Sequence, residues 1–457
     1  MSNYLQCCLE AYPDLSVEIC ELHRRIIQWK DIYRGIPPWR TTKKSGLYPN
    51  GSRRVAMLNC GKSLCDELAA LALTEKPTMA VSVKSYENLL KNWLNATSFF
   101  TCLERFLPCS YALGGGAIRL YVKDGRILPD YVPADRFFPV AWIGGQITEA
   151  IFVSRYRNGK TVYTILERHG FDLDGNVMVS NKAFKSCNAY STATPCNSEE
   201  CGGIPETVIY KGVKNPIFSY FLPAGTNNLF ENIPVGMSAF GSCIDTLKAI
   251  DTAFDSFTRE FVLGAKRIIV PSSAIRTVAD LETGKMKRYF DANDEVFVAL
   301  KCDEPESLRV IDNTVELRIE EHISALTSLF NILCSQVGLS KGALSFDDER
   351  VMRTATEVIS QQSRSYRTMK KMQNSLGNSV SEVLRSVIAL ECALRGMEVA
   401  KFDVSVQFRD NVIEDDRTKT DEIIKLVNAG LMSKKTAVQR LFGLNEKDAA
   451  AEAARLS

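Results

Sequence analysis

One stretch of the sequence predicts an unusually long helix. From Arg353 to Leu376 the chain reads RTATEVISQQSRSYRTMKKMQNSL, without proline, and the same spacing continues to about Arg395. At 1.5 Å per residue, a helix from Arg353 to Arg395 is about 65 Å long, which exceeds the diameter of an average domain. The stripe at alternating steps of four and three contains Ala355, Ile359, Gln362, Tyr366, Met369, Gln373, Leu376, Val380, Val383, Val387, Leu390 and Leu394. So narrow a stripe lacks the broad apolar face of a helix packed on one globular core.

Small and hydroxylated residues beside this stripe bear on what the helix packs against. A long coiled-coil dimer needs one dry apolar seam, which Gln362 and Gln373 interrupt. Small side chains instead allow close packing on two flanks, as in a ring where each helix touches two neighbours. They are Thr354, Thr356, Ser360, Ser363, Ser365, Ser375 and Ser379. The pattern favours the ring over the dimer.

Composition and charge exclude some classes of protein. The chain has 457 residues, of which 45% are hydrophobic and 24% charged, as in an ordinary globular protein. Its 56 basic and 54 acidic side chains leave a formal net charge of +2, without the basic excess of a protein that grips nucleic acid tightly. The start, MSNYLQCCLEAYPD, lacks the features of a signal peptide, and no window is apolar for long enough to cross a bilayer. We therefore expect a soluble protein.

The fourteen cysteines are scattered without a CxxC pair, which predicts reduced thiols. The one loose cluster, Cys187, Cys196 and Cys201, lies in the polar stretch from Ser186 to Pro205. Its spacing fits no common zinc site and no histidine is near. We interpret the stretch as a cysteine-bearing surface loop without a metal.

The first half of the chain predicts helices followed by an antiparallel sheet. The segment from Arg53 to Leu73, RRVAMLNCGKSLCDELAALAL, is expected to be one amphipathic helix. Beyond it, Asp124-Gly125, Asn158-Gly159 and Asp174-Gly175 separate alternating apolar runs, which is the pattern of β-hairpins. The predicted fold class is therefore α+β.

The second half predicts two helices around a short β-containing segment. In the first helix, Asp255 and Arg259 have the favourable i, i+4 spacing of an ion pair. Asn313 and Glu316 resemble a capping box that opens the second helix. After the long helix, an alternating run around Val404 predicts one strand that returns to a sheet.

No motif predicts catalysis. CGKS at Cys60 to Ser63 resembles the end of a P-loop, but Ala56 stands where the first glycine is needed, and the segment reads as a helix. The run Gly114 to Gly116 precedes a strand rather than a helix, which favours a tight turn over a phosphate cradle. We predict no catalytic residues, no cofactors and no metal site.

Several segments, in chain order, resemble the portal (head–tail connector) proteins of tailed double-stranded DNA bacteriophages, in the branch common in phages of Gram-positive hosts. They are ALGGGAIRLYV, DYVPADRFFPV, VGMSAFGSCIDTLKAIDTAFDSFTREF, KRIIVP, GLSKGALSFDD and RTATEVISQQSRSYRT. The likeness covers nearly the whole chain except Ser186 to Pro205. It implies an elongated α+β portal subunit, usually one of twelve in a ring (a dodecamer) around a channel at one capsid vertex.

The resemblance implies a division of the chain into regions. These are a wing (1–242, completed by a strand at 401–411), a first stem helix (243–264), a clip (265–312), a second stem helix (313–338), a tunnel loop (339–352), a long spoke helix (353–398) and a crown (412–457). The long helix would then be a spoke of the ring, and its other faces would meet neighbouring subunits.

Three groups of candidate site residues follow from the resemblance. The tunnel loop, expected to be mobile because it has little to bury, would face DNA with Ser340, Lys341, Gly342, Ser345 and Asp347. The stem would line the channel with Lys248, Asp255, Arg259, Glu316 and Glu320. The clip would dock the terminase and neck proteins with Lys285, Lys287 and Arg288.

Charges on the stem helices fit a channel if that assignment holds. The first helix has four acidic residues (Asp245, Asp251, Asp255, Glu260) and two basic ones (Lys248, Arg259), a net of −2. The second has three acidic residues (Glu316, Glu320, Glu321) and one basic residue (Arg318), again −2. An acidic wall repels the phosphate backbone, so a duplex can slide along it.

The expected partners are other copies of the chain, the terminase large subunit, major capsid and scaffolding proteins, head-completion or neck proteins, and double-stranded DNA passing through the channel. No membrane is expected, and the predicted location is the capsid vertex of a virion assembled in the host cytoplasm. Two alternatives stay open: a coiled-coil structural or scaffold protein unrelated to DNA, and an NTP-dependent enzyme that uses Gly61 to Ser63.

Overall fold

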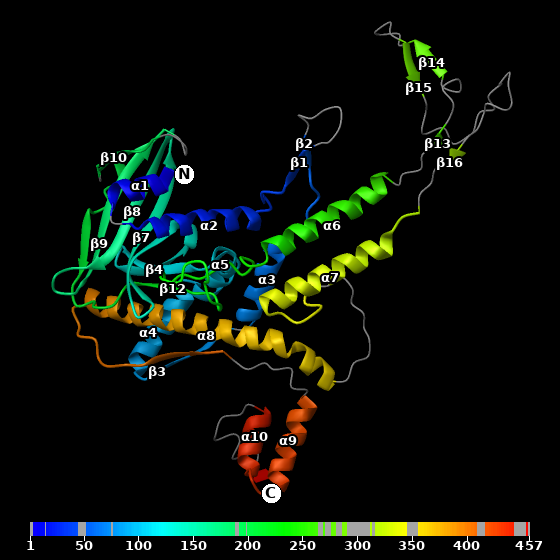
Figure 1. Ribbon diagram of the computed structural model, residues 1–457. Helices are drawn as coiled ribbons and strands as arrows, with labels where there is room; N and C mark the ends of the chain where they lie inside the picture. Colours follow the sequence, from blue (N-terminus) through cyan, green and yellow to red (C-terminus); the bar gives the residue numbers. More distant parts are fainter. Residues whose placement is uncertain are drawn as a thin grey trace, which may run out of the picture. The chain divides into compact units, whose positions relative to one another are not determined.

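The fold is known from a computed structural model (Figure 1). It describes residues 3–13, 15–43, 52–74, 76–187, 192–197, 199–263, 268–269, 276–279, 286–289, 311–312, 316–344, 355–408, 416–442 and 454–455. The chain divides into two compact units. The larger unit contains Met1–Pro37, Asn59–Ile244 and Leu333–Ser457, and the smaller unit contains Pro38–Leu58 and Asp245–Ile332.

The larger unit contains most of the described helices. They are α1 (Asn3–Ala11), α2 (Val17–Tyr33), α3 (Cys60–Ala72), α4 (Lys84–Ala96), α5 (Phe99–Leu113), the long α8 (Ala355–Leu394), α9 (Asp416–Asn428), α10 (Lys434–Phe442) and the short 3-10 helices η1 (Ala134–Arg136) and η2 (Glu199–Cys201). Helix α2 shows why these segments are helical. The Ser16 side chain accepts a hydrogen bond from the Ile19 amide at its start, and Glu18 and Lys30 suit the two ends of the helix dipole.

The strands of the larger unit form antiparallel sheets. The strands are β3 (Thr78–Val81), β4 (Gly116–Lys123), β5 (Arg126–Pro133), β6 (Phe137–Ile143), β7 (Gln146–Asn158), β8 (Thr161–Phe171), β9 (Val177–Ser186), β10 (Thr194–Cys196), β11 (Thr207–Tyr210), β12 (Phe218–Phe221) and β17 (Val404–Gln407). One sheet has the order β10-β9-β8-β7-β6, with β11 also paired to β9, and a second has the order β12-β4-β5. A buried cluster packs these two sheets together, and its members are Ala117, Val132, Phe137, Ala150, Phe152 and Phe218. The α+β prediction is confirmed.

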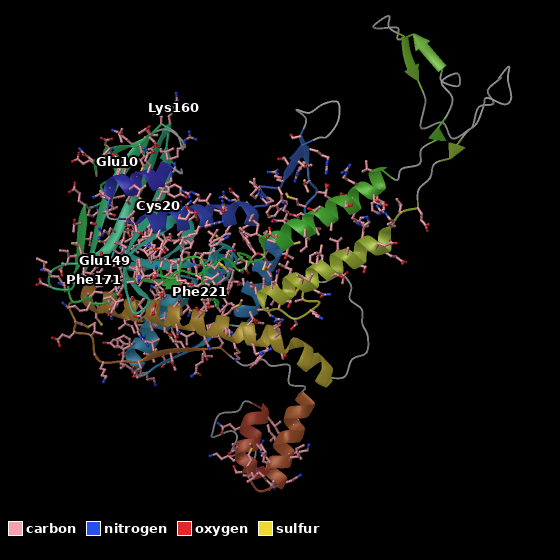
Figure 2. The ribbon with its side chains drawn as sticks, viewed as in Figure 1. Glu10, Cys20, Glu149, Lys160, Phe171 and Phe221 are labelled. Carbon is pink, nitrogen blue, oxygen red and sulfur yellow. The ribbon has the colours of Figure 1, made fainter. Side chains whose placement is uncertain are left out.

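The predicted hairpins are present. Strands β4 and β5 pair around the Asp124-Gly125 turn, and β8 connects to β9 through a turn in which Asp172 accepts bonds from the Asp174 and Asn176 amides at 3.0 and 2.7 Å. The β7–β8 turn lies one residue later than expected, because Asn158 already pairs with Thr161. Figure 2 labels Lys160 at the tip of this hairpin and Phe171 near its other end.

Gly114 shows that the three-glycine run is a tight junction, as the sequence indicated. It ends α5 in the left-handed conformation, with φ of 78°. A Cβ atom there would lie 2.5 Å from the carbonyl oxygen of Gly236, which no side chain tolerates. The run therefore lets the chain turn from α5 into β4 against a neighbouring backbone.

The helix predicted at 53–73 begins later than expected. Residues Ser52–Arg54 form a strand, β2, and α3 starts at Cys60, after Asn59 adopts a left-handed conformation with φ of 52°. The apolar residues Val55 and Leu58 continue the helical spacing by coincidence, since they belong to a different unit of the fold. In CGKS, Gly61 lies inside the helix and packs on side chains of α2 and of the segment before α6.

Helix α8 is nearly as long as predicted, but its C-terminal half is buried over a wider face than the narrow apolar stripe indicates. Its 40 residues correspond to about 60 Å, and from Leu376 to Cys392 it is buried on most sides inside its own subunit. Strand β12 packs on it, and β17 and α4 also contact it (Figure 1). The buried apolar residues are Leu376, Val380, Val383, Leu384, Val387, Ile388 and Leu390, each worth about 1.5–3 kcal/mol when fully buried.

The hydroxyl side chains of α8 explain how a stripe with little apolar width can be buried. Ser379 donates a hydrogen bond to the Tyr220 carbonyl at 3.4 Å, and Ser386 donates to the Pro216 carbonyl at 2.9 Å. These bonds join the helix to β12 and its flank in the same chain. The prediction that these faces meet neighbouring subunits is therefore wrong for the C-terminal half of the helix. In its N-terminal part, side chains 355–362 lie outside the described residues.

The strand expected after the long helix is β17. It pairs antiparallel with β3, with Val404 opposite Val81 and Gln407 opposite Thr78. The pairing joins the chain beyond α8 to a strand that lies more than 300 positions earlier in the sequence.

The smaller unit contains a pair of antiparallel helices. They are α6 (Ile244–Leu263) and α7 (Ile319–Val337), with α7 belonging to this unit as far as Ile332. Its described strands are short and pair two by two: β1 (Thr41–Lys43) with β2 (Ser52–Arg54), β13 (Ile268–Ile269) with β16 (Ile311–Asp312), and β14 (Arg276–Ala279) with β15 (Met286–Tyr289). No described helix in either unit is both long and apolar enough to cross a lipid bilayer.

Candidate functional site

The α6–α7 hairpin contains most of the predicted stem residues. Its helices meet where the C-terminal end of α6 lies beside the N-terminal end of α7 (Figure 1). The Arg318 guanidinium bonds both carboxylate oxygens of Glu260, at 3.0 and 3.1 Å, and the rings of Phe257 and His322 are 5.6 Å apart. The hydrogen bonds from Arg318 lower the pKa of Glu260 to about 2.

Helix α7 begins at Ile319, which corrects the predicted start at Asn313. Asn313 lies outside the described residues, and Glu316 lies in the non-helical segment before the first turn. Glu316 is therefore not in the third position of the helix, and the predicted capping box is wrong. The first turn of α7 instead contains Glu320 and Glu321, whose charges suit the N-terminal end of the helix dipole.

Two aspartates of α6 anchor the segment from Pro38 to Leu58. The carboxylate of Asp251 accepts bonds from the Trp39 indole at 2.8 Å and from the Leu58 amide at 3.1 Å. Burial raises the pKa of Asp251. Because the two partners lie at opposite ends of the segment, one side chain holds both its entry and its exit.

Asp255, one turn later, makes the stronger contact. Both terminal guanidinium nitrogens of Arg53 bond its two oxygens at 2.6 and 2.7 Å, and the Ala56 amide bonds the same carboxylate at 2.9 Å. The bidentate bond from Arg53 lowers the pKa of Asp255. The predicted pair of Asp255 with Arg259 is thus replaced by a pair with Arg53, 202 residues away in sequence.

The surface charge of α6 differs from the charge counted in its sequence. Asp251 and Asp255 are 5% and 8% exposed, and Glu260 is half-buried and paired across the hairpin. The exposed charges of this helix are one acidic residue and two basic ones, a net of +1: Asp245, Lys248 and Arg259.

The acidic wall predicted from the sequence is therefore wrong for α6. A buried Asp255 with its own partners does not fit a place on a channel wall. On α7, Glu320 and Glu321 are exposed, as an acidic wall requires.

The chain segment after α7 begins with a docked portion. Thr368 on α8 donates to the Gly338 carbonyl at 2.7 Å. The Ser340 amide donates to the Ser365 hydroxyl at 2.8 Å, and Ser340 is 7% exposed. The prediction that Ser340 faces outward from a mobile loop is therefore wrong.

One protein-family model matches nearly the whole chain. The family model described as phage portal protein, SPP1 Gp6-like, matches residues 20–456. The chain belongs to the phage portal protein family. No curated protein matches the chain. The family resemblance inferred from sequence is thus confirmed, including its relation to phages of Gram-positive hosts.

The portal family match gives the chain a role as a structural component of a phage head–tail connector, involved in DNA packaging. Portal proteins are a structural family rather than an enzyme family. Members of this family are expected to form a ring associated with the capsid. The match begins within α2 and includes the Ser186 to Pro205 stretch that the resemblance of individual segments does not cover.

Of the other four residues predicted for the tunnel loop, the structure describes two. Lys341 and Gly342 follow the docked portion and are exposed, and Gly342 adopts a left-handed φ of 85° that favours glycine. Ser345 and Asp347 lie outside the described residues. Within the described part of the predicted loop, Lys341 is thus the one cation, and its side chain is exposed.

The structure describes the residues predicted for the clip only in part. Lys287 and Arg288 lie on β15, opposite Val278 and Thr277 of β14. Their side chains, and Lys285 as a whole, lie outside the described residues.

Four of the five predicted stem residues are exposed. Lys248 and Arg259 lie on α6, Glu320 lies in the first turn of α7, and Glu316 lies just before that turn. The structure therefore keeps these residues at the surface of one hairpin, whereas Asp255 is an internal anchor.

The cysteine-bearing stretch forms part of the large sheet. Cys196 on β10 and Cys201 in η2 have their sulfur atoms 3.1 Å apart, whereas Cys187 is exposed. The described residues include no group of three or more side chains arranged to hold a metal ion. The stretch thus combines a close thiol pair with the pairing of β10 to β9.

A polar groove that the sequence does not predict lies between α8 and β17. It has a volume of about 930 Å³ and is lined by Gln373, Asn374, Asn378, Arg385 and the residues of β17, among others. Gln373 is 5% exposed, and its amide oxygen has no hydrogen-bond partner in the described part of the chain. The interruption of the apolar stripe at Gln373 is the signal in the sequence, which by itself argues only against a coiled coil.

Proposed function

We propose that this portal protein forms a closed ring around a channel at one capsid vertex, with twelve subunits as expected for its family. The genome enters through this channel, driven by the terminase large subunit, and later leaves through it, and neck proteins attach to the ring. The observation that supports this proposal is the continuous match to the portal family over residues 20–456, which spans the α6–α7 hairpin and α8. Capsid and scaffolding proteins contact the ring during assembly in the host cytoplasm.

The regions of the chain have distinct proposed roles. Residues 1–242 with the strand at 401–411 form the wing, α6 and α7 form the stem, and residues 265–312 form the clip. Residues 339–352 form the tunnel loop, α8 is the spoke, and residues 412–457 form the crown. The antiparallel stem hairpin supports this division, because it presents the segment between its helices at one end.

The proposed DNA contact is weak and exchangeable. Lys341 is exposed beyond the portion of the loop that Ser365 holds, so its ammonium can approach a passing phosphate. One cation per subunit gives each copy a small contribution, whereas many phosphate contacts per copy would hold the duplex in place. Ser345 and Asp347 are proposed to continue this surface.

The proposed docking surface for the terminase and the neck proteins is the clip. Lys285, Lys287 and Arg288 give each copy three positive charges within four residues. A ring of such copies would attract an acidic surface on its partner.

Electron microscopy of the purified full-length protein in negative stain tests the ring. We expect annular particles with a central hole, whereas elongated dimers would contradict the proposal. The protein is not expected to hydrolyse ATP, since the motor supplies that activity, and hydrolysis by the isolated ring would favour the enzyme alternative instead.

A packaging assay tests the tunnel loop. Deletion of residues 341–345 and, separately, Lys341→Glu should leave rings intact and reduce the DNA packaged per capsid. Lys160→Glu is the charge-matched control, because Lys160 is exposed at the tip of the β7–β8 hairpin, away from the loop (Figure 2). Normal packaging by both loop variants would contradict DNA contact, and loss of rings would indicate a structural role.

A further inference from the structure

Arg259 lies on the face of α6 opposite α7. It follows Phe257 by two residues, and Phe257 contacts His322 of α7. Two residues correspond to about 200° around a helix, so the two side chains point in nearly opposite directions. Arg259 is exposed, and no carboxylate in the described part of the chain lies within ion-pair distance of it. The carboxylate one turn before it, on Asp255, is bound by Arg53.

Glu321 lies on the exposed side of α7. Nine residues separate it from Phe330, which is 5% exposed, and nine residues correspond to about two and a half turns of a helix. Glu321 therefore points away from the buried side of α7, and both it and the adjacent Glu320 are exposed. The hairpin thus has a positive charge on the outer face of α6 and negative charges on the outer face of α7.

These opposite charges lie at the same level of the hairpin. Arg318, just before α7, bonds Glu260 of α6, the immediate neighbour of Arg259 in the sequence. The end of α6 with Arg259 is therefore level with the start of α7, which contains Glu320 and Glu321. Rotation about a ring axis leaves the height along that axis unchanged, so for a hairpin that runs along the axis Arg259 of one copy comes level with Glu321 of the next.

Small side chains on the same two faces allow the helices of adjacent copies to approach closely. On α6, Thr252 and Ser256 precede Arg259 at helical spacing and are exposed. On α7, Ala325 and Ser328 follow Glu321 at the matching spacing and are also exposed. Between such faces there is room for the long side chain of Arg259 to cross from one helix to the other.

An exposed apolar side chain lies on the same face of α6. Val262 follows Arg259 by three residues, which places it one turn further along that face, and it is 71% exposed. Contact with a neighbouring copy would remove this apolar surface from water, which is favourable.

We propose that α6 of one subunit packs against α7 of its neighbour, with Arg259 paired to Glu321 and Glu320 of that neighbouring copy. The interface is heterologous, because it joins two different faces of identical chains, and such an interface closes into a ring when the rotation between subunits closes. This inference rests on the ring of the proposed function. The proposed contact places Arg259 and Glu320 between subunits. Lys248, the other exposed cation of α6, takes no part in it.

Charge reversal tests the pairing in the purified full-length protein. Arg259→Glu should raise the protein concentration for half-assembly into rings by about five- to tenfold, since it converts attraction into repulsion at every interface. The combined Glu320→Arg and Glu321→Arg variant should have the same defect. Native mass spectrometry and negative-stain microscopy measure the ring fraction.

Lys248→Glu is the matched control for the same helix face. Lys248 precedes Arg259 by eleven residues, which is about three turns, so the two side chains share one side of α6 at different heights. Helix α7 has no acidic residue after Glu321 that could meet Lys248 at its height. This variant should therefore assemble as the wild type does.

Mixing the two defective proteins separates a contact between subunits from one within a subunit. Each protein alone places like charges at every interface. In a ring of alternating copies, the introduced glutamate lies beside the introduced arginines at one interface, and the native Arg259 lies beside the native glutamates at the next. Rings should therefore recover when equal amounts are mixed, and high salt should reduce the defect of each protein alone.

Three results would overturn the pairing. They are normal assembly of Arg259→Glu, an equal loss in Lys248→Glu, and failure of the mixture to recover rings although both defective proteins keep the wild-type unfolding temperature. A wild-type protein without rings would instead contradict the proposed function, so the two failures are distinguishable.

Discussion

Helices α6 and α7 have the same net charge by sequence count and use their acidic residues in opposite ways. On α6, Asp251 and Asp255 are buried and hold the segment from Pro38 to Leu58 through side-chain and backbone bonds. On α7, Glu320 and Glu321 are exposed at the first turn. A carboxylate with several donors around it is a structural anchor, whereas an exposed one is available to a partner. Counting charges along a helix does not distinguish the two.

The largest expected effect is at Asp255. Asp255→Ala leaves the Arg53 guanidinium without its bidentate acceptor and the Ala56 amide without its bond. We expect a loss of about 2–4 kcal/mol in the stability of the smaller unit, as for removing one partner of a largely buried ion pair. Chemical denaturation and hydrogen exchange at the Ala56 amide measure it. A change within about 0.5 kcal/mol and unchanged exchange would show that the anchor does not hold the segment.

A smaller effect is expected at Asp251. Asp251→Ala removes the acceptor for the Trp39 indole and the Leu58 amide, a loss of about 1–2 kcal/mol in the free energy of unfolding. The loss is smaller than at Asp255 because both donors to Asp251 are neutral, whereas Asp255 accepts a bidentate bond from the charged Arg53. Hydrogen exchange at the Leu58 amide should become faster, and an unchanged rate would mean that this amide has another acceptor.

The pH dependence of the two aspartates should have opposite signs. The pKa of Asp255 is lowered from 3.8, so its stabilisation is present above about pH 3.8 and is lost as the pH falls through the folded value. The pKa of Asp251 is raised from 3.8, so its protonation favours the folded state, and its contribution becomes more favourable as the pH falls through that raised value. Unfolding midpoints of Asp255→Asn should therefore decline less in acid than those of wild type, and those of Asp251→Asn should decline more. If the unfolding midpoints of both variants differed from wild type in the same direction in acid, the opposite pKa shifts of the two aspartates would be contradicted.

Glu260 tests the link between the two helices. Its pKa of about 2, against 4.5 for an ordinary glutamate, means that its stabilisation is present above about pH 4.5 and lost as the pH falls toward 2. Glu260→Gln should flatten this part of the stability profile, measured by thermal unfolding from about pH 5 downward. Arg318→Gln should have the same effect, because Arg318 is the main cause of the shift, and an unchanged profile in either variant would contradict the pair.

The smallest effect on stability is expected for the exposed acids of α7. Glu320→Gln and Glu321→Gln should change the free energy of unfolding of the isolated subunit by about 0.5 kcal/mol or less, as changes at exposed side chains usually do. The comparison with Asp255→Ala is informative because both changes remove one negative charge from the same hairpin. A large loss at Glu321 would show that it is an anchor like Asp255 rather than a group available to a neighbour.

Much of the local structure is predictable from the sequence. The turn dipeptides indicate the hairpins because Asp-Gly and Asn-Gly favour the conformations that short connections need. The helical spacing indicates α6, most of α7 and α8. The β1–β2 pair is not predicted, because Val55 and Leu58 continue the apolar spacing of α3, although the turn dipeptide Asn50-Gly51 directly precedes β2.

The candidate site is less predictable, because its burial depends on distant partners. Lys248, Arg259 and Glu320 are exposed as expected, but Asp255 and Ser340 are buried. The bond that Asp255 accepts from Arg53 spans 202 positions in the sequence, and the one between Ser340 and Ser365 spans 25. No local pattern reports a bond of that kind.

Local patterns are sufficient to specify two paired helices, a set of antiparallel hairpins and one helix of about 60 Å, because helical spacing and turn chemistry act over a few residues. Packing in three dimensions selects which sides of those helices are covered. The hydroxyl groups of Ser379 and Ser386 are buried against the β12 region, although serine is usually exposed, because carbonyls of that region accept their bonds. Burial of a polar side chain depends on which partner is brought close to it, and the fold supplies that partner.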